Sequence, residues 1–169
     1  MQDLHTLTQG RPIAIVGAGL VGSGWALVFA RAGLNVRIFD ANPAIASAAV
    51  PLIKGQIADL TAHGLLSESA DVILARLTVC DTLADAVNGA IYVQESILER
   101  TDVKRTLMLE LEAVAAPDLI IGSSTSGIPA SVFASGLSIT PRVIIAHPVN
   151  PPYLVPVVEI VPSPETALQ

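Results

Sequence analysis

Short apolar runs recur along the chain, each four or five residues long and bounded by polar, Gly or Pro positions. Continuous apolar runs of this length are typical of strands in a parallel sheet, because both faces of such strands are buried. The predicted strands cover residues 13–16, 36–39, 77–80, 90–93, 119–122, 143–146 and 157–161.

Helical signals fill the stretches between these runs. Asn42 followed by Pro43 is a favourable helix start, since Asn caps the free amide groups and Pro fits the first turn. Apolar side chains at helical spacing support a long helix in the middle of the chain. Helices are predicted over residues 23–32, 43–63, 69–76 or 67–76, 81–87, 96–115 and from Pro129 onward, after a polar lead-in over residues 1–11.

Strands alternating with helices predict an α/β fold of the Rossmann type. Parallel neighbours need crossovers, which are right-handed and are usually helices. We expect a doubly wound, mostly parallel sheet with helices on both faces and the strand order 3-2-1-4-5-6. Residues 12–169 would form this one domain, and the Pro-rich stretch from Pro148 to Pro164 would be an edge or a linker rather than a second domain.

A glycine-rich turn follows the first predicted strand. Gly17, Gly19 and Gly22 have the G-x-G-x-x-G spacing. Gly17 permits the tight turn, Gly19 lets a pyrophosphate approach the backbone, and Gly22 lets the helix pack closely on the strands. The amide groups of Leu20 and Val21, at the start of the helix, would face the phosphates.

Asp40 ends the second strand, 18 residues after Gly22. A carboxylate at this place accepts hydrogen bonds from ribose hydroxyls and repels a 2′-phosphate, so NAD is expected in preference to NADP. A purely structural glycine turn or a ligand that is not a nucleotide is the competing interpretation.

Composition narrows the class of protein further. The chain has 169 residues, 51% of them hydrophobic and 14% charged, and a net charge of −6. Acidity and the lack of a basic run disfavour nucleic-acid and anionic-membrane partners. No transmembrane helix or signal peptide is expected, the single Cys80 excludes an internal disulfide, and a cytoplasmic location fits these features.

Three polar residues lie near the ends of the later strands. Ser126 follows the fifth strand, His147 ends the sixth, and Glu159 lies in the last apolar run. His accepts a hydroxyl proton near neutral pH, a carboxylate fixes its tautomer, and a Ser hydroxyl binds the reacting oxygen. Alone, His147 would more often be a solvated or core histidine, but a carboxylate among apolar residues needs a partner. No set of side chains has metal-ligand spacing.

The motifs GAGLVGSGWALVFARAG, SSTSGI and AHPVNPPYLVPVVEIVPSPET resemble the 3-hydroxyacyl-CoA dehydrogenase family. The last motif is closest to the λ-crystallin and L-gulonate 3-dehydrogenase branch. The resemblance implies that His147 is the catalytic base and Glu159 its paired acid. It also implies that Ser126 binds the substrate oxygen and that Asn150 lines the same pocket.

The same resemblance assigns the cofactor side. Leu20 and Val21 would contact NAD through their backbone, and Asp40 would bind its adenosine ribose. Glu99 and Lys104 match a Glu and a Lys of the family and would lie near the nicotinamide half. The alternative for this pair is that both are solvated charges on a helix.

Family members continue into a helical C-terminal domain that forms a homodimer and closes the substrate cleft, whereas this chain ends at Gln169. Apolar surface is therefore expected to be exposed near the C-terminal tail. The leading hypothesis is a NAD-dependent oxidoreductase acting on a 3-hydroxyacyl-CoA or a free 3-hydroxy acid such as L-gulonate. The alternative is a non-catalytic λ-crystallin-like protein or a NAD-sensing module.

Overall fold

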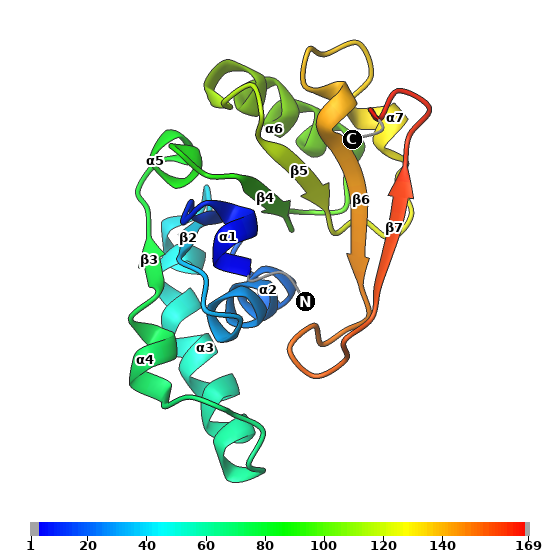
Figure 1. Ribbon diagram of the computed structural model, residues 1–169. Helices are drawn as coiled ribbons and strands as arrows, with labels where there is room; N and C mark the ends of the chain where they lie inside the picture. Colours follow the sequence, from blue (N-terminus) through cyan, green and yellow to red (C-terminus); the bar gives the residue numbers. More distant parts are fainter. Residues whose placement is uncertain (1–3, 168–169) are drawn as a thin grey trace.

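Seven strands form one sheet in the computed structural model, which describes residues 4–167 (Figure 1). Their order is β3-β2-β1-β4-β5-β6-β7, which confirms the predicted doubly wound arrangement and adds β7 at the edge. All pairs are parallel except β6–β7, which is antiparallel. The strands are β1 (Ile13–Val16), β2 (Val36–Phe39), β3 (Leu77–Val79), β4 (Tyr92–Glu95), β5 (Ile120–Ser123), β6 (Val143–Pro148) and β7 (Val158–Pro162).

The helices alternate with the strands as expected. They are α1 (Leu4–Thr8), α2 (Leu20–Arg31), α3 (Pro43–Ala62), α4 (Ala70–Leu74), α5 (Leu83–Val87), α6 (Thr101–Val114) and α7 (Ala130–Phe133). The lead-in contains the short helix α1 instead of being irregular. Asn42 caps α3 as predicted, with its side-chain oxygen accepting from the Ala44 amide at 3.0 Å.

The helix α6 begins at Thr101, five residues later than the apolar spacing predicted. The carboxylate of Glu95 accepts the amide proton of Ile97, and Arg100 donates its amide to the carbonyl of Leu98. These bonds hold residues 96–100 as a loop at the end of β4. Glu99 therefore lies on this loop and not on a helix.

The fourth strand was predicted two residues too early. The turn at Gly89 has a positive φ of 69°, and the strand itself runs from Tyr92 to Glu95. As a result Gln94 and Glu95 lie inside the strand and are fully buried, at 0% exposure. Hydrogen bonds and an ion pair with other parts of the chain compensate for the burial of this polar pair.

Two apolar clusters cover the two faces of the sheet, as the helices in Figure 1 show. One cluster packs α2, α3 and α4 against the sheet through residues such as Leu27, Ile53 and Ile73. The other packs α5, α6 and α7 through Val87, Met108 and Phe133. The carboxyl ends of the parallel strands are therefore left uncovered between the two helical layers.

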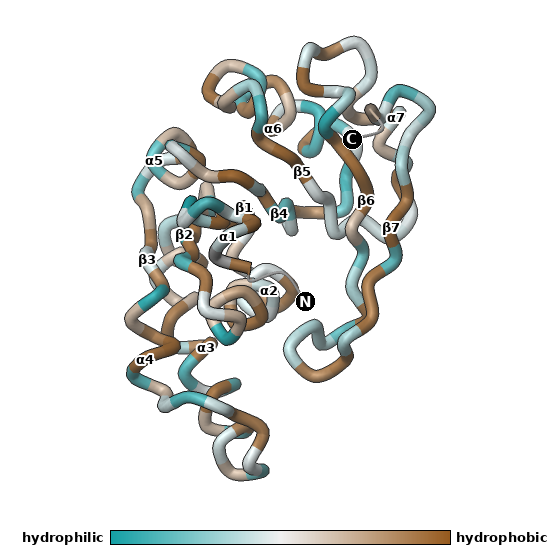
Figure 2. Tube along the Cα trace, viewed as in Figure 1, coloured by the Kyte–Doolittle hydropathy of each residue, from teal (hydrophilic) through white to brown (hydrophobic). Residues whose placement is uncertain are grey.

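The edge strand β7 is apolar but uncovered (Figure 2). Every residue of Val158–Pro162 is exposed, and the exposure of Ile160 reaches 60%. This confirms the expected apolar surface near the C-terminal tail. Among residues 4–167, no helix is both long and apolar enough to cross a membrane.

Candidate active site

The glycine turn between β1 and α2 is a close-packed cradle with one open position. A Cβ on Gly17, which has a φ of +95°, would lie 2.6 Å from the carbonyl carbon of Ser96. A Cβ on Gly22 would lie 1.8 Å from the carbonyl oxygen of Gly17. At Gly19 a Cβ would meet nothing within 4 Å. Two glycines thus allow close packing, and the third leaves open space where a ligand can approach the backbone.

The start of α2 is suited to an anion. Gly19 is the N-cap and supplies no side-chain cap, and the first turn has no acidic residue. The amides of Leu20 and Val21 lie in that first turn, where no helical carbonyl can pair with them. Leu20 is 75% exposed, so the approach is open. The cradle therefore fits the pyrophosphate of a dinucleotide.

Asp40 joins the glycine turn to the start of α3. Its Oδ2 accepts the amide proton of Ala18 at 2.8 Å, and its Oδ1 accepts that of Asn42 at 2.8 Å. The carboxylate remains partly exposed. It is consequently a structural clamp as well as the predicted partner of the adenosine ribose.

A cavity of about 660 Å³ extends from Asp40 across the glycine turn to the loop after β4. This is within the usual range of small-molecule sites. Apolar and polar residues line it, among them Gly17, Gly19, Asp40, Asn42, Ile45, Ser96, Leu98, Val103 and Leu107. The cavity, the open position at Gly19 and the uncapped start of α2 together fit a NAD molecule.

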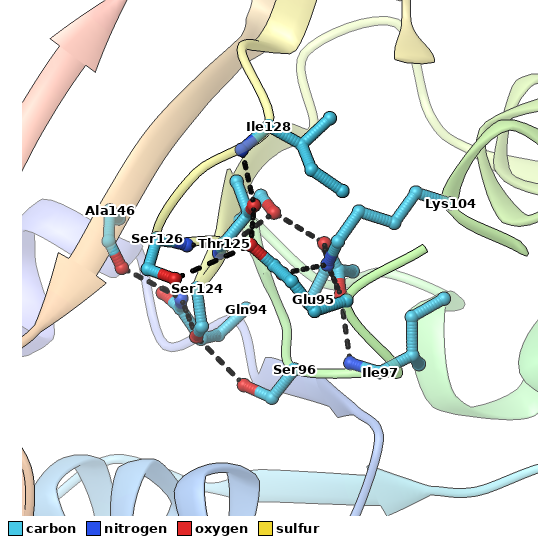
Figure 3. A network of polar contacts seen from close by, with 12 residues as sticks. Gln94, Glu95, Ser96, Ile97, Lys104, Ser124, Thr125, Ser126, Ile128 and Ala146 are labelled. Carbon is cyan, nitrogen blue, oxygen red and sulfur yellow. Dashed lines mark hydrogen bonds and ion pairs between the residues drawn. The ribbon is translucent and has the colours of Figure 1, made fainter. Parts of the chain in front are cut away.

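The amino group of Lys104 is buried against the carboxylate of Glu95. Its side chain is 1% exposed, and Nζ lies 2.8 Å and 2.9 Å from the two carboxylate oxygens of Glu95 (Figure 3). Glu95 also accepts the hydroxyl of Ser123. The interpretation of Lys104 as a solvated charge is wrong, whereas its place near the nicotinamide half of the cofactor stays a prediction. Lys104 instead neutralises a carboxylate buried at the end of β4.

Glu99 fastens the loop that carries Ser126. Its Oε1 accepts from the Thr125 hydroxyl at 2.5 Å and from the amides of Ser126 and Gly127 at 2.9 Å and 3.1 Å. Desolvation raises the pKa of the Glu99 carboxyl, but these hydrogen bonds and the charge of Lys104 outweigh it, so the pKa lies below its ordinary value. Glu99 thus positions the loop in its ionised form.

His147 and Glu159 face each other across the antiparallel pair of β6 and β7. Nδ1 of His147 lies 2.7 Å from Oε2 of Glu159, which is the hydrogen bond predicted from the sequence. The side chains are 26% and 66% exposed. Nε2 of His147 makes no hydrogen bond with any residue in the described part of the chain, so it is free to act on a ligand.

Ser126 and Asn150 lie at the same carboxyl edge of the sheet as His147. Ser126 follows β5, and Asn150 follows β6 by two residues, in a loop whose Pro152 packs against α2. Both residues are exposed. Neighbouring parallel strands end at one edge, so Ser126 and His147 lie at the same edge of the sheet. Neither is among the residues that line the cavity described above, and their roles toward a substrate remain predictions. Within residues 4–167, no three His, Cys, Asp or Glu side chains gather as a metal site.

Sequence reasoning missed Gln94, Ser96, Ser124 and the pairing of Glu95 with Lys104. The available signal was the sequence Gln94-Glu95 directly after an apolar run, with Gly122 inside the next strand. Polar residues in a buried strand must find partners there. A glycine in a strand often marks the close approach of another group.

The sheet order, the glycine cradle and the cavity at the reversal of strand order define a Rossmann-type dinucleotide-binding domain. Residues 12–169 match the family model described as "3-hydroxyacyl-CoA dehydrogenase, NAD binding domain". The chain belongs to the 3-hydroxyacyl-CoA dehydrogenase family, and it is a NAD-binding domain.

Relatives of several kinds share this sequence and fold. Rabbit lambda-crystallin is 38% identical over 157 residues, 92% of this chain and 49% of that protein. L-carnitine dehydrogenase from Streptomyces coelicolor is 41% identical over 157 residues, 93% of this chain and 48% of that enzyme. The structure of (S)-3-hydroxybutyryl-CoA dehydrogenase from Ralstonia eutropha has a TM-score of 0.87 at 28% identity, covering 93% of this chain and 56% of that one. The chain spans about half the length of the curated relatives it matches.

Proposed function

We propose that this domain oxidises the 3-hydroxyl group of a 3-hydroxy acid or of its CoA thioester, with NAD as the oxidant. The observation that carries the proposal is the hydrogen bond between His147 and Glu159 in a chain that belongs to a NAD-binding family. Bound NAD supplies a hydride acceptor. The protein must then hold the alcohol and remove its proton.

His147 supplies the base in this scheme. The Nδ1–H group of the ring donates a hydrogen bond to Glu159. This leaves Nε2 unprotonated and able to take the hydroxyl proton of the substrate. As that proton arrives, the imidazole becomes positively charged, and the carboxylate of Glu159 stabilises it. The Ser126 hydroxyl donates a hydrogen bond to the reacting oxygen, and Glu99 holds the loop that positions it.

The relatives support two substrate classes. A 3-hydroxybutyryl-CoA dehydrogenase represents the CoA thioesters. L-carnitine is a free 3-hydroxy acid, so the L-carnitine dehydrogenases support the second class, in which we also place L-gulonate.

The test is NADH formation, followed by absorbance at 340 nm, with a panel of CoA thioesters and free 3-hydroxy acids. The protein is used alone and extended by a helical domain of the family's kind. We expect turnover in the extended form with at least one class, and little in the chain alone. Absence of NADH from every member of the panel, in a form that binds NAD, contradicts the proposal.

A non-catalytic role is the second candidate, since the relatives include lambda-crystallins. It predicts that NAD binds tightly but that no 3-hydroxy compound reduces it. The exposed His147–Glu159 pair favours chemistry, because a binding module does not need a base with one free ring nitrogen.

A further inference from the structure

Gln94 is a fully buried polar residue that the dehydrogenase chemistry does not use. It lies in β4 at 0% exposure, where an amide without partners is costly. Its Oε1 lies 2.5 Å from the Tyr92 hydroxyl, and its Nε2 lies 2.8 Å from the Ser124 hydroxyl and 3.2 Å from the carbonyl oxygen of Ala146. Figure 3 shows this amide between the loop after β5 and strand β6.

Gly122 allows the Tyr92 hydroxyl to reach the side chain of Gln94. It lies opposite Gln94 in β5, between Gln94 and the strand that carries Ala146. A Cβ on Gly122 would lie 1.9 Å from the Tyr92 hydroxyl and 3.1 Å from Cβ of Ala146. The missing side chain therefore leaves room beside β5 for the Tyr92 hydroxyl, which is the partner of the Gln94 oxygen.

The orientation of the amide is fixed by its partners. The carbonyl of Ala146 only accepts, so the nitrogen of Gln94 must face it and the oxygen must face Tyr92. Tyr92 then donates its proton. Burial raises the pKa of the Tyr92 phenol, which keeps that proton in place.

The orientation continues outward through two hydroxyl groups. Ser124 accepts from Gln94, and its oxygen lies 2.8 Å from that of Ser96. Either hydroxyl can donate in this bond, and the cooperative arrangement, in which each group both accepts and donates, has Ser124 donating to Ser96. Ser96 makes no other side-chain hydrogen bond with the described residues, so its own proton is left free. Ser96 is partly exposed and lines the large cavity next to Gly17.

We propose that Ser96 donates a hydrogen bond to an oxygen of the nicotinamide nucleoside half of NAD, and that Gln94 is the positioning residue that orients it through Ser124. The inference rests on the NAD site and not on the oxidation proposed above. A dinucleotide crosses the sheet where the strand order reverses, between β1 and β4. Asp40 follows β2 and binds the adenosine half of NAD. Ser96 follows β4, on the other side of β1, and therefore faces the nicotinamide nucleoside half.

The test compares the affinities of the chain for NADH and for ADP, by fluorescence and by calorimetry. ADP has the adenosine and the pyrophosphate but lacks the nicotinamide nucleoside. Ser96→Ala is expected to weaken NADH about 2- to 10-fold, the worth of one hydrogen bond, and to leave ADP unchanged. Ser96→Thr, which keeps the hydroxyl, retains the affinity. Ser47→Ala, which removes an exposed hydroxyl on α3, is the matched control.

Ser124→Ala breaks the chain without removing Ser96. It is expected to weaken NADH but not ADP, and the double variant with Ser96→Ala is expected to be no weaker than Ser96→Ala alone. ADP-ribose distinguishes the two oxygen groups that Ser96 could contact. If Ser96→Ala lowers the affinity for both ADP-ribose and NADH, the ribose is the acceptor, and if it lowers the affinity for NADH alone, the carboxamide is. Unchanged NADH affinity in Ser96→Ala, an equal loss for ADP, or additive losses in the double variant would overturn the proposal.

Discussion

Glu159 lies directly opposite His147 in the antiparallel pair of β6 and β7, with Oε2 2.7 Å from Nδ1 of the ring. Opposite residues on antiparallel strands have adjacent side chains, so the backbone register itself sets this contact. The two side chains meet without any contribution from a loop. It remains accessible, since the ring is 26% exposed.

This pairing predicts the tautomer of His147. The neutral ring carries its proton on Nδ1, because the carboxylate of Glu159 accepts a hydrogen bond from that nitrogen. In the nitrogen-15 NMR spectrum of the chain, we expect His147 to populate the Nδ1–H form, and Glu159→Leu to shift it toward the mixture seen in free histidine. A ring protonated mainly on Nε2 in the unmodified chain would contradict the assignment of the base.

Asp40 should affect both cofactor choice and stability. Asp40→Ala removes the carboxylate that repels a 2′-phosphate, so NADH binds more weakly and its preference over NADPH narrows. The amides of Ala18 and Asn42 also lose their acceptor, which we expect to lower the free energy of unfolding by about 1–3 kcal/mol. Fluorescence titration and urea unfolding measure the two effects. Equal affinity of the unmodified chain for both cofactors would refute the first.

The buried pair of Lys104 and Glu95 should dominate the local stability of β4. Lys104→Met leaves the Glu95 carboxylate buried without a counter-charge and should cost about 3–5 kcal/mol of unfolding free energy. The double variant Glu95→Gln/Lys104→Met should recover part of this loss, because no charge remains buried. Urea unfolding checks both. A loss below about 1 kcal/mol for Lys104→Met would show that the amino group is not confined as described.

The Ser126 loop should loosen in acid. The pKa of the Glu99 carboxyl is below its ordinary value of 4.5, so its hydrogen bonds stabilise the loop fully above pH 4.5. That contribution is lost as the pH falls through the lowered pKa. We expect the amide NMR signals of Ser126 and Gly127 to shift with a midpoint below 4.5, and Glu99→Gln to abolish this transition. A midpoint above 4.5 would mean that the loop does not favour the ionised form.

The sequence predicted what depends on local patterns. Residues 13–40 contain a strand, a glycine turn, a helix, a second strand and an acid in fixed order, and the structure confirms the strands at Ile13–Val16 and Val36–Phe39. The contact between His147 and Glu159 was also predictable, because an acid in an apolar strand needs a partner.

Residues 90–104 were predicted poorly because their structure depends on distant contacts. Glu95 is buried in the sheet because Lys104 neutralises it, and Gln94 because Gly122 leaves room for the Tyr92 hydroxyl with which it bonds. Neither compensation is visible in a local pattern. Glu99 and Lys104 are predicted to lie on one helix, whereas Glu99 is an exposed residue of the loop before α6, and its carboxylate lies 3.6 Å from Nζ of the buried Lys104.

The role of His147 as the base is the central claim, and the single-turnover rate of NADH formation tests it most directly. The measurement uses saturating NAD and a 3-hydroxy substrate identified in the panel, in the form extended by a helical domain. We expect His147→Gln to slow this rate about 100- to 10,000-fold while the affinity for NADH is unchanged. A rate within about 3-fold of the unmodified protein, at equal NADH affinity, would contradict the account.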